Sequence, residues 1–173
     1  MRRALTALTD ELREGKSLAG IGIGVPGMID RATSVIQKAP NVPYLDGWRI
    51  GDVFENLGSP VAAENDSRCF VLAEYRWGAA QGFKNIIGLA RGPGIGGGSI
   101  IDGKLSAGSH NAAGEFGHIV LGIRNQESGI MGDTLEEMGA KKAFEKYGNR
   151  SAIIGIGVAN LINAFDPDAV VLG

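Results

Sequence analysis

Glycine is the residue that most limits how this chain can fold. The 173 residues include 28 glycines, against a typical usage of about 7%. They show no collagen-like period and form no Gly/Ser linker, but gather at the ends of apolar runs, in residues 20–27, 88–98 and 103–117. Glycine in such places favours tight turns beside strands and close approach of the backbone to another group.

Composition and charge exclude several classes of protein. Hydrophobic residues make up 44% of the chain and charged residues 21%, which is enough apolar surface to bury a core. Lys and Arg number 17 and Asp and Glu 19, so no basic field is available to bind a nucleic-acid backbone. The chain has neither a signal-peptide pattern nor an apolar run of roughly 20 residues. We expect a cytoplasmic protein with no nucleic-acid or membrane partner.

Metal and disulfide chemistry have few residues to draw on. Cys69 is the single cysteine, so an internal disulfide is impossible. His110 and His118 are the two histidines, and with one cysteine they do not make a structural zinc quartet. The sequence therefore predicts no metal ligated by its own side chains.

Apolar spacing and turn residues predict a mixture of helices and strands. The glycine run at 92–98 is expected to be a loop between two strands. The mixture predicts an α/β protein of layered architecture. The expected helices are 3–14, 67–80, 134–147 and 152–164, with helical turns at 50–57, and the expected strands are 18–25, 34–39, 61–63, 85–90, 99–102, 119–121 and 169–172.

The glycine run contains a Gly-x-Gly-x-x-Gly match at Gly92, Gly94 and Gly97. The dinucleotide-binding fingerprint requires a strand before it and a helix after it, whereas a strand is expected after this run, so a Rossmann dehydrogenase is disfavoured. A glycine loop between two strands could still present backbone N–H groups to phosphate oxygens. A tight hairpin without a ligand is the open alternative.

Two short segments carry polar groups suited to binding a sugar or moving a proton. In Glu64-Asn65-Asp66, Asp66 could take a proton from a hydroxyl and Asn65 could hydrogen-bond neighbouring hydroxyls. From the tripeptide alone, a helix N-cap explains the residues more simply. In the segment 114–118, Glu115 and His118 suit recognition of vicinal hydroxyls, and an ordinary surface pair is the alternative.

A capping box is expected further along the chain. Thr134 and Glu137 have the spacing of this motif, in which each side chain hydrogen-bonds the other residue's backbone N–H. Glu136 and Glu137 are therefore explained by default without a role in function.

Taken in order, five motifs resemble the ROK family of sugar kinases and sugar-responsive repressors. The resemblance implies an actin-like, ribonuclease-H-like ATPase fold of class α/β, with two lobes and mixed sheets. On that basis residues 1–66 form part of the N-terminal lobe and residues 67–173 the C-terminal lobe. Weaker matches follow at 134–136 and 159–173. The five motifs are Gly22–Gly27, Ala39–Asn41, Glu64–Asp66, Gly92–Gly98 and Gly114–His118.

The resemblance implies transfer of a phosphoryl group from ATP, with Mg²⁺, to a hydroxyl of a hexose. Asp66 is then the base that accepts the hydroxyl proton. It also implies a homodimer or homotetramer. The implied sugar-binding residues are Asn41, Asn65, Glu115, His118 and Glu136, and the implied phosphate-contacting residues are Gly92, Gly94, Gly96 and Gly97.

The sequence departs from the family's pattern in five places, one of which is at residues 148–151, where it joins segments that the family separates by a long helical stretch. Nothing before Gly22 matches the family's first phosphate loop, Asp-x-Gly-Gly-Thr, and the family's sequence continues beyond Gly173. Residues 123–133 lack the cysteines with which many members bind zinc, so zinc is not expected here. Pro93 replaces a threonine and removes one backbone N–H from the glycine run.

Two explanations of these departures stay open. Either the sequence is part of a longer protein, or it is a truncated relative that keeps the sugar half and has lost ATP chemistry. The first is preferred because 173 residues alone would leave strands of both lobes without partners. The alternative function is that of a non-catalytic sugar-binding or sugar-sensing regulator. The sequence does not identify the sugar.

Overall fold

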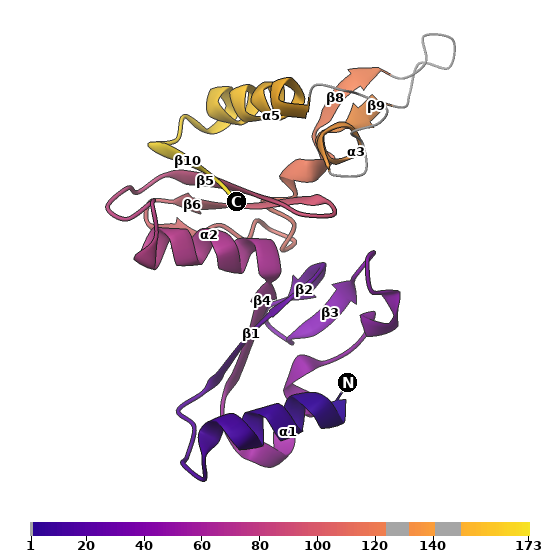
Figure 1. Cartoon of the computed structure of the whole chain (residues 1–173), viewed down its shortest axis with the longest axis vertical. Helices are drawn as coiled ribbons and strands as arrows, with labels where there is room; N and C mark the ends of the chain where they lie inside the picture. Colours follow the sequence, from indigo (N-terminus) through magenta and orange to yellow (C-terminus); the bar gives the residue numbers. More distant parts are fainter. Residues whose placement is uncertain (1, 124–131, 141–149) are drawn as a thin grey trace. The chain divides into compact units, whose positions relative to one another are not determined.

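The computed structural model describes residues 2–123, 132–140 and 150–173. By its internal contacts the chain divides into two compact units, Met1–Asp66 and Ser67–Gly173. Each unit has its own sheet and hydrophobic core (Figure 1).

The first unit combines one helix with two small sheets and three short 3₁₀ turns. Strands β1 and β4 pair in parallel, whereas β2 and β3 form an antiparallel hairpin. Its elements are α1 (Arg2–Arg13), β1 (Ile21–Val25), β2 (Met28–Asp30), β3 (Val35–Lys38), η1 (Pro43–Leu45), η2 (Ile50–Val53), η3 (Glu55–Leu57) and β4 (Val61–Asn65).

Apolar residues of the hairpin form the centre of the first core. Ile29 and Ile36 face each other across β2 and β3 and are both fully buried. Val25 and Phe54 join the same cluster, and Leu5 of α1 packs against it. Of the leucines at helical spacing in residues 3–14, Leu5 contacts this core, whereas Leu8 and Leu12 are exposed.

The second unit is built on a four-stranded mixed sheet with the order β10-β5-β6-β7. Strand β10 is parallel to β5, and the β5–β6 and β6–β7 pairs are antiparallel. A separate hairpin joins β8 and β9. The elements are α2 (Asp66–Trp77), which begins at the last residue of the first unit, β5 (Ile86–Arg91), β6 (Ile95–Ile101), β7 (Lys104–Leu105), η4 (Phe116–His118), β8 (Val120–Ile123), β9 (Gly132–Thr134), α3 (Leu135–Gly139), α5 (Arg150–Phe165) and β10 (Ala169–Leu172).

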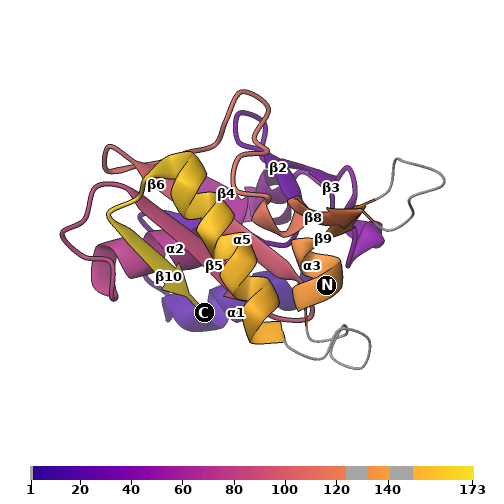
Figure 2. The same cartoon turned by 90° about the horizontal axis from the view of Figure 1, so that it is seen from above.

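Helices cover both faces of this sheet, with α2 on one face and α5 on the other (Figures 1 and 2). Ile87 and Leu89 of β5 share a buried cluster with Leu161 of α5. Ile86 precedes Ile87 in the strand and therefore faces the opposite side of the sheet, where it shares a second buried cluster with Val71 of α2. Burial on both faces explains why β5 is a continuous apolar run rather than an alternating one.

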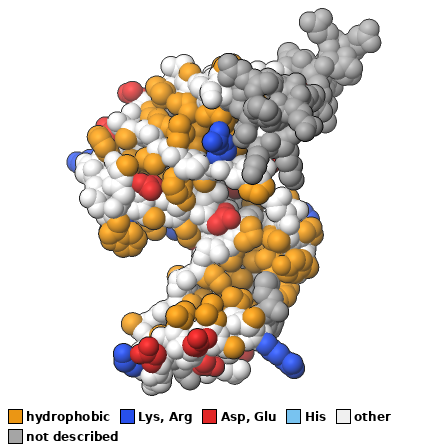
Figure 3. All heavy atoms as spheres, in the orientation of Figure 1, with side chains coloured by type: hydrophobic (Ala, Val, Ile, Leu, Met, Phe, Trp, Pro, Cys, Tyr) orange, Lys and Arg blue, Asp and Glu red, His pale blue; other side chains and the backbone are white. Residues whose placement is uncertain are grey.

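The outer face of α5 carries no charge. From Ser151 to Phe165 the helix has no charged residue. Ile156 and Ile162 are exposed, as is Leu172 of the neighbouring β10. Figure 3 shows hydrophobic side chains on the surface of the second unit. Such a composition is typical of a helix that packs on both sides.

The prediction of a loop over residues 92–98 is wrong for its second half. Strand β6 begins at Ile95, so Gly96, Gly97 and Gly98 are strand residues paired with β5. A Cβ on Gly96 would collide with the side chain of Ser67, and one on Gly97 would lie 2.6 Å from the ring of Phe116. Close packing on both faces of the strand, rather than a turn, therefore accounts for these glycines.

The prediction of one helix over residues 134–147 is also wrong. Helix α3 ends at Gly139, and Ala140 has extended backbone angles. Residues 141–147 lie outside the described part of the chain. Gly139 packs against Ile95 and Ile154, and a Cβ there would lie 2.9 Å from the Ile154 side chain. The other predicted helices and strands are confirmed, with ends shifted by up to four residues.

A carboxylate closes the junction between β5 and β10 and gives a testable pH dependence. Asp168 accepts hydrogen bonds from the backbone N–H groups of Asn85 and Lys84, at 2.7 and 3.0 Å. These bonds, the one from Asn85 first, hold the pKa of Asp168 below its ordinary value of 3.8. Because the folded-state pKa is lowered, the stabilisation is present above the unfolded-state value and is lost as the pH falls through the folded-state value.

We therefore expect the urea midpoint of the wild type to fall between about pH 5 and about pH 3, and the fall to be smaller in Asp168→Asn, which cannot titrate. Asp52→Asn, an exposed carboxylate changed in the same way, serves as the control. Equal acid sensitivity of wild type and Asp168→Asn would contradict the assignment.

Candidate functional site

Asn65 is the buried polar residue at the end of β4 in the first unit. Its side-chain amide donates a hydrogen bond to the backbone oxygen of Gly27 at 3.0 Å. Gly27 in turn lies directly against the backbone of Lys38 and Ala39, which lead into the turn that holds the exposed Asn41. The Pro26–Gly27 turn thus joins the two segments that contain the predicted sugar-binding asparagines of this unit.

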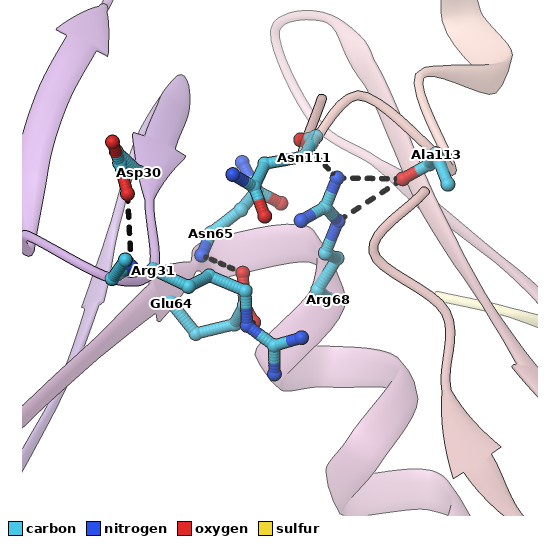
Figure 4. A network of polar contacts seen from close by, with 8 residues as sticks. Asp30, Arg31, Glu64, Asn65, Arg68, Asn111 and Ala113 are labelled. Carbon is cyan, nitrogen blue, oxygen red and sulfur yellow. Dashed lines mark hydrogen bonds and ion pairs between the residues drawn. The ribbon is translucent and has the colours of Figure 1, made fainter. Parts of the chain in front are cut away.

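An ion pair supports the same strand end. The Arg31 guanidinium Nε lies 2.9 Å from Glu64 Oε2. The other oxygen of Glu64 accepts a hydrogen bond from the backbone N–H of Asn65 at 2.9 Å (Figure 4). Asp30 closes the turn that carries Arg31, by accepting from the backbone N–H groups of Ala32 and Thr33. Neither Asp30 nor Arg31 was predicted from the sequence to belong to the site.

Asp66 follows immediately as the first residue of α2, and its side chain is exposed. It is therefore fixed between a strand whose end is anchored and a helix whose first turn is buried on one side, at Arg68. The chain thus places an exposed carboxylate at the junction of β4 and α2.

Arg68 is a buried cation that holds the loop ahead of Glu115. Only 2% of Arg68 is exposed. Its guanidinium donates to the backbone oxygen of Ala113 from Nε at 3.1 Å and from Nη2 at 2.7 Å, and to that of Asn111 at 2.5 Å (Figure 4). Nothing in the local sequence pattern indicated this role, because the partners are more than 40 residues away.

Glu115 and His118 lie next to each other at the 3₁₀ turn η4 of the second unit. Glu115 precedes the turn and His118 ends it, and His118 Nε2 lies 4.0 Å from Glu115 Oε2. Both side chains reach the surface. The predicted proximity is confirmed, while the distance is too long for a hydrogen bond and leaves both groups able to accept a ligand.

Glu136 lies at the start of α3, where the predicted capping box is confirmed. Thr134 accepts from the backbone N–H of Glu137, and Glu137 accepts from that of Thr134. Glu137 thus completes the cap, and the Glu136 side chain takes no part in it. Its Oε2 instead accepts a hydrogen bond from the backbone N–H of Ile95 at 2.7 Å.

The β5–β6 hairpin turns through Gly92, Pro93 and Gly94. The backbone N–H of Gly92 donates to the oxygen of Gly94 at 2.9 Å. Pro93 has no N–H, and that of Ile95 is held by Glu136. A Cβ on Gly92 would meet nothing within 4 Å, so the tip of the hairpin is open.

The second unit therefore brings η4, the hairpin tip and the start of α3 together. Gly117 packs directly on the backbone oxygen of Ile95. A Cβ added to Gly117 would lie 3.4 Å from the Cβ of Glu136. This places the segments of Glu115, His118 and Glu136 beside the glycine hairpin. In the described ranges, no three His, Cys, Asp or Glu side chains gather closely enough to hold a metal ion. No helix in those ranges has the length and apolar character needed to cross a bilayer.

Comparison with known proteins identifies the family. The model of the ROK family matches residues 1–151. The chain belongs to the ROK family. This ROK chain is 32% identical to a glucokinase of Streptomyces coelicolor over 151 residues, which is 87% of the chain and 45% of the relative. It is 30% identical to an N-acetylgalactosamine kinase of a Shewanella species, with 98% of the chain and 68% of the relative covered. The ROK chain thus spans about half the length of the Streptomyces relative.

Solved structures share the fold of the ROK chain. A ROK hexokinase from Thermus thermophilus has a TM-score of 0.81 at 31% identity, covering 99% of this chain and 68% of the other. A ROK glucokinase from Streptomyces griseus, in complex with glucose and AMPPNP, has a TM-score of 0.82 at 25% identity, covering 99% and 70%. The predicted actin-like ATPase fold is therefore confirmed.

Proposed function

We propose that this ROK chain carries out ATP-dependent phosphorylation of a hexose hydroxyl, with Asp66 as the general base. The observation that carries the proposal is the position of Asp66. It is exposed, it begins α2, and it directly follows Asn65, whose amide is anchored on Gly27. A carboxylate held in this way can accept the proton that a hydroxyl loses when it attacks phosphorus.

In this proposal the two units are the two lobes of the kinase, residues 1–66 and 67–173. Asn41 and Asn65 of the first unit hydrogen-bond sugar hydroxyls. Glu115, His118 and Glu136 of the second unit bind the others. Two amides, two carboxylates and an imidazole provide both donors and acceptors, as hydroxyl recognition requires.

Open space at the tip of the glycine hairpin supports a phosphate contact there. Gly92 faces open space, whereas Gly96 and Gly97 are packed against neighbouring side chains. The backbone N–H groups of Gly92 and Ile95 already have partners in the protein. We propose that ATP lies against Gly92 and Gly94 and that the strand glycines 96 and 97 serve by close packing. Bound ATP with Mg²⁺ would supply the phosphoryl group and neutralise its charge.

The relatives favour a hexose as the substrate class. Two of them are a glucokinase and an N-acetylgalactosamine kinase, and a solved neighbour is a glucokinase in complex with glucose. Glucose and the 2-acetamido hexoses are therefore the first sugars to test.

The test is ADP release from ATP and Mg²⁺ with a panel of glucose, N-acetylglucosamine, N-acetylgalactosamine and N-acetylmannosamine, run beside calorimetric binding of each sugar. We expect turnover with at least one hexose and none without sugar. A relative that is 28% identical is a putative xylose repressor, so a sensor is the second candidate. Sugar binding without ADP release would favour the sensor and overturn the kinase.

A further inference from the structure

Glu136 is in contact with two parts of the proposed site. Its carboxylate oxygen Oε2 accepts the backbone N–H of Ile95 at 2.7 Å. Ile95 is the first residue of β6 and follows directly on the Gly92–Gly94 tip of the hairpin. A hydrogen bond from an N–H to an ionised carboxylate is among the stronger ones in proteins. The bond therefore fixes one side of the hairpin tip to α3.

The hairpin tip and η4 pack closely around this bond. A Cβ added to Gly94 would collide with Oε2 of Glu136 and lie 3.0 Å from its Cδ. A Cβ added to Gly117 would collide with the backbone oxygen of Ile95. Glycine at these two positions is what allows the hairpin, η4 and α3 to approach this closely.

The carboxylate has capacity for a second partner. An ionised carboxylate has two oxygens and about four lone-pair sites. The bond to Ile95 uses Oε2, and the capping box at the start of α3 is completed by Glu137. Oε1 can therefore accept from a sugar hydroxyl while Oε2 keeps its hold on the hairpin.

We infer that Glu136 is a positioning residue that couples hexose binding to nucleotide binding. The inference rests on the proposed function, in which Glu136 binds a sugar hydroxyl and the hairpin tip contacts phosphate. A bound hydroxyl on Oε1 fixes the carboxylate, and the fixed carboxylate orders the hairpin tip through Ile95. The sugar then tightens the nucleotide and, by linkage, the nucleotide tightens the sugar by the same factor.

The test measures the Kd of AMPPNP with Mg²⁺ by calorimetry, with and without saturating hexose, the hexose being the best binder of the panel above. For the wild type we expect hexose to tighten AMPPNP by at least about fivefold. In Gly94→Ala the added methyl displaces the carboxylate from Ile95, so the factor should fall close to one.

Gly155→Ala is the control, because it adds the same methyl to the second unit, in α5, where nothing lies within 4 Å. The factor by which hexose tightens AMPPNP should stay that of the wild type. Glu136→Gln is the second variant. It keeps the size of the side chain, loses the charge that strengthens the bond to Ile95, and should also lower the factor.

Circular dichroism and Tm confirm that each variant is folded before binding is measured. An unchanged factor in Gly94→Ala and Glu136→Gln would overturn the inference. So would a wild type that binds both ligands independently, and in that case the proposed function stands. A wild type that binds no hexose overturns the proposed function and the coupling together, so the two failures are distinguishable.

Discussion

Replacing Asp66 with Asn should lower kcat for hexose phosphorylation by about 10²- to 10⁴-fold, which is the usual contribution of a positioned general base. Asn has nearly the same shape as Asp and cannot accept a full proton. Asp66 is exposed at the start of α2, so the substitution does not alter the hydrophobic core. Hexose Kd, measured by calorimetry, should therefore stay close to that of the wild type while ADP release is lost.

Asp52→Asn is the control for this experiment. Asp52 is also exposed and also lies in the first turn of a helical segment, η2, and the change in charge is the same. It should keep wild-type turnover. If Asp66→Asn turned over as fast as Asp52→Asn, Asp66 would not be the base.

Replacing Gly27 with Ala should lower the free energy of unfolding by about 2–5 kcal/mol, the sum of a positive-φ penalty and a collision in a packed region. Gly27 has φ +89°, and its Cβ would collide with the backbone oxygen of Lys38 and lie 2.7 Å from Ala39 Cα. Both obstacles are backbone atoms, which cannot rotate aside. Urea unfolding measures the loss.

Gly47→Ala separates the two contributions. Gly47 has φ +79° in the same unit, but a Cβ there would meet nothing within 4 Å. It should lose only the backbone penalty of about 1–2 kcal/mol. If the two variants lost the same free energy of unfolding, the hairpin would have to shift to accommodate the added methyl, and the predicted collision at Gly27 would be wrong. Because the oxygen of Gly27 accepts the Asn65 amide, folded Gly27→Ala should also bind hexose more weakly, whereas Gly47→Ala should not.

Local signals in the sequence predicted most of the elements. Helix α5 was expected over 152–164 and extends over Arg150–Phe165, because an apolar run ahead of Asp166 and Pro167 admits few other structures. The capping box at Thr134 and Glu137 was read from spacing alone, since both partners lie within one helical turn.

Long-range packing decided what the sequence pattern could not. Glycine is normally depleted in strands, so the run at 92–98 predicted a loop. Strand β6 nevertheless pairs with β5 through these glycines, and their lack of a Cβ lets the strand pack closely against Ser67 and Phe116. The hydrogen bond from Ile95 to Glu136 joins residues 41 positions apart. The spacing of residue types along a helix or strand cannot predict a contact at that separation. In the candidate site, the types of residue could be predicted from the sequence. The contacts that Arg31 makes with Glu64 and that Arg68 makes with the loop ahead of Glu115 could not.

The parallel pairing of β5 with β10 also affects the order of folding. Asn85 and Asp168, which close that pair, are 83 positions apart. Antiparallel β5 and β6 need only a three-residue turn and can form as soon as both leave the ribosome. The apolar face of β5 that receives α5 must wait for most of the second unit to be synthesised. Non-local pairing of this kind raises contact order and slows folding, and the uncovered face is open to aggregation in the meantime.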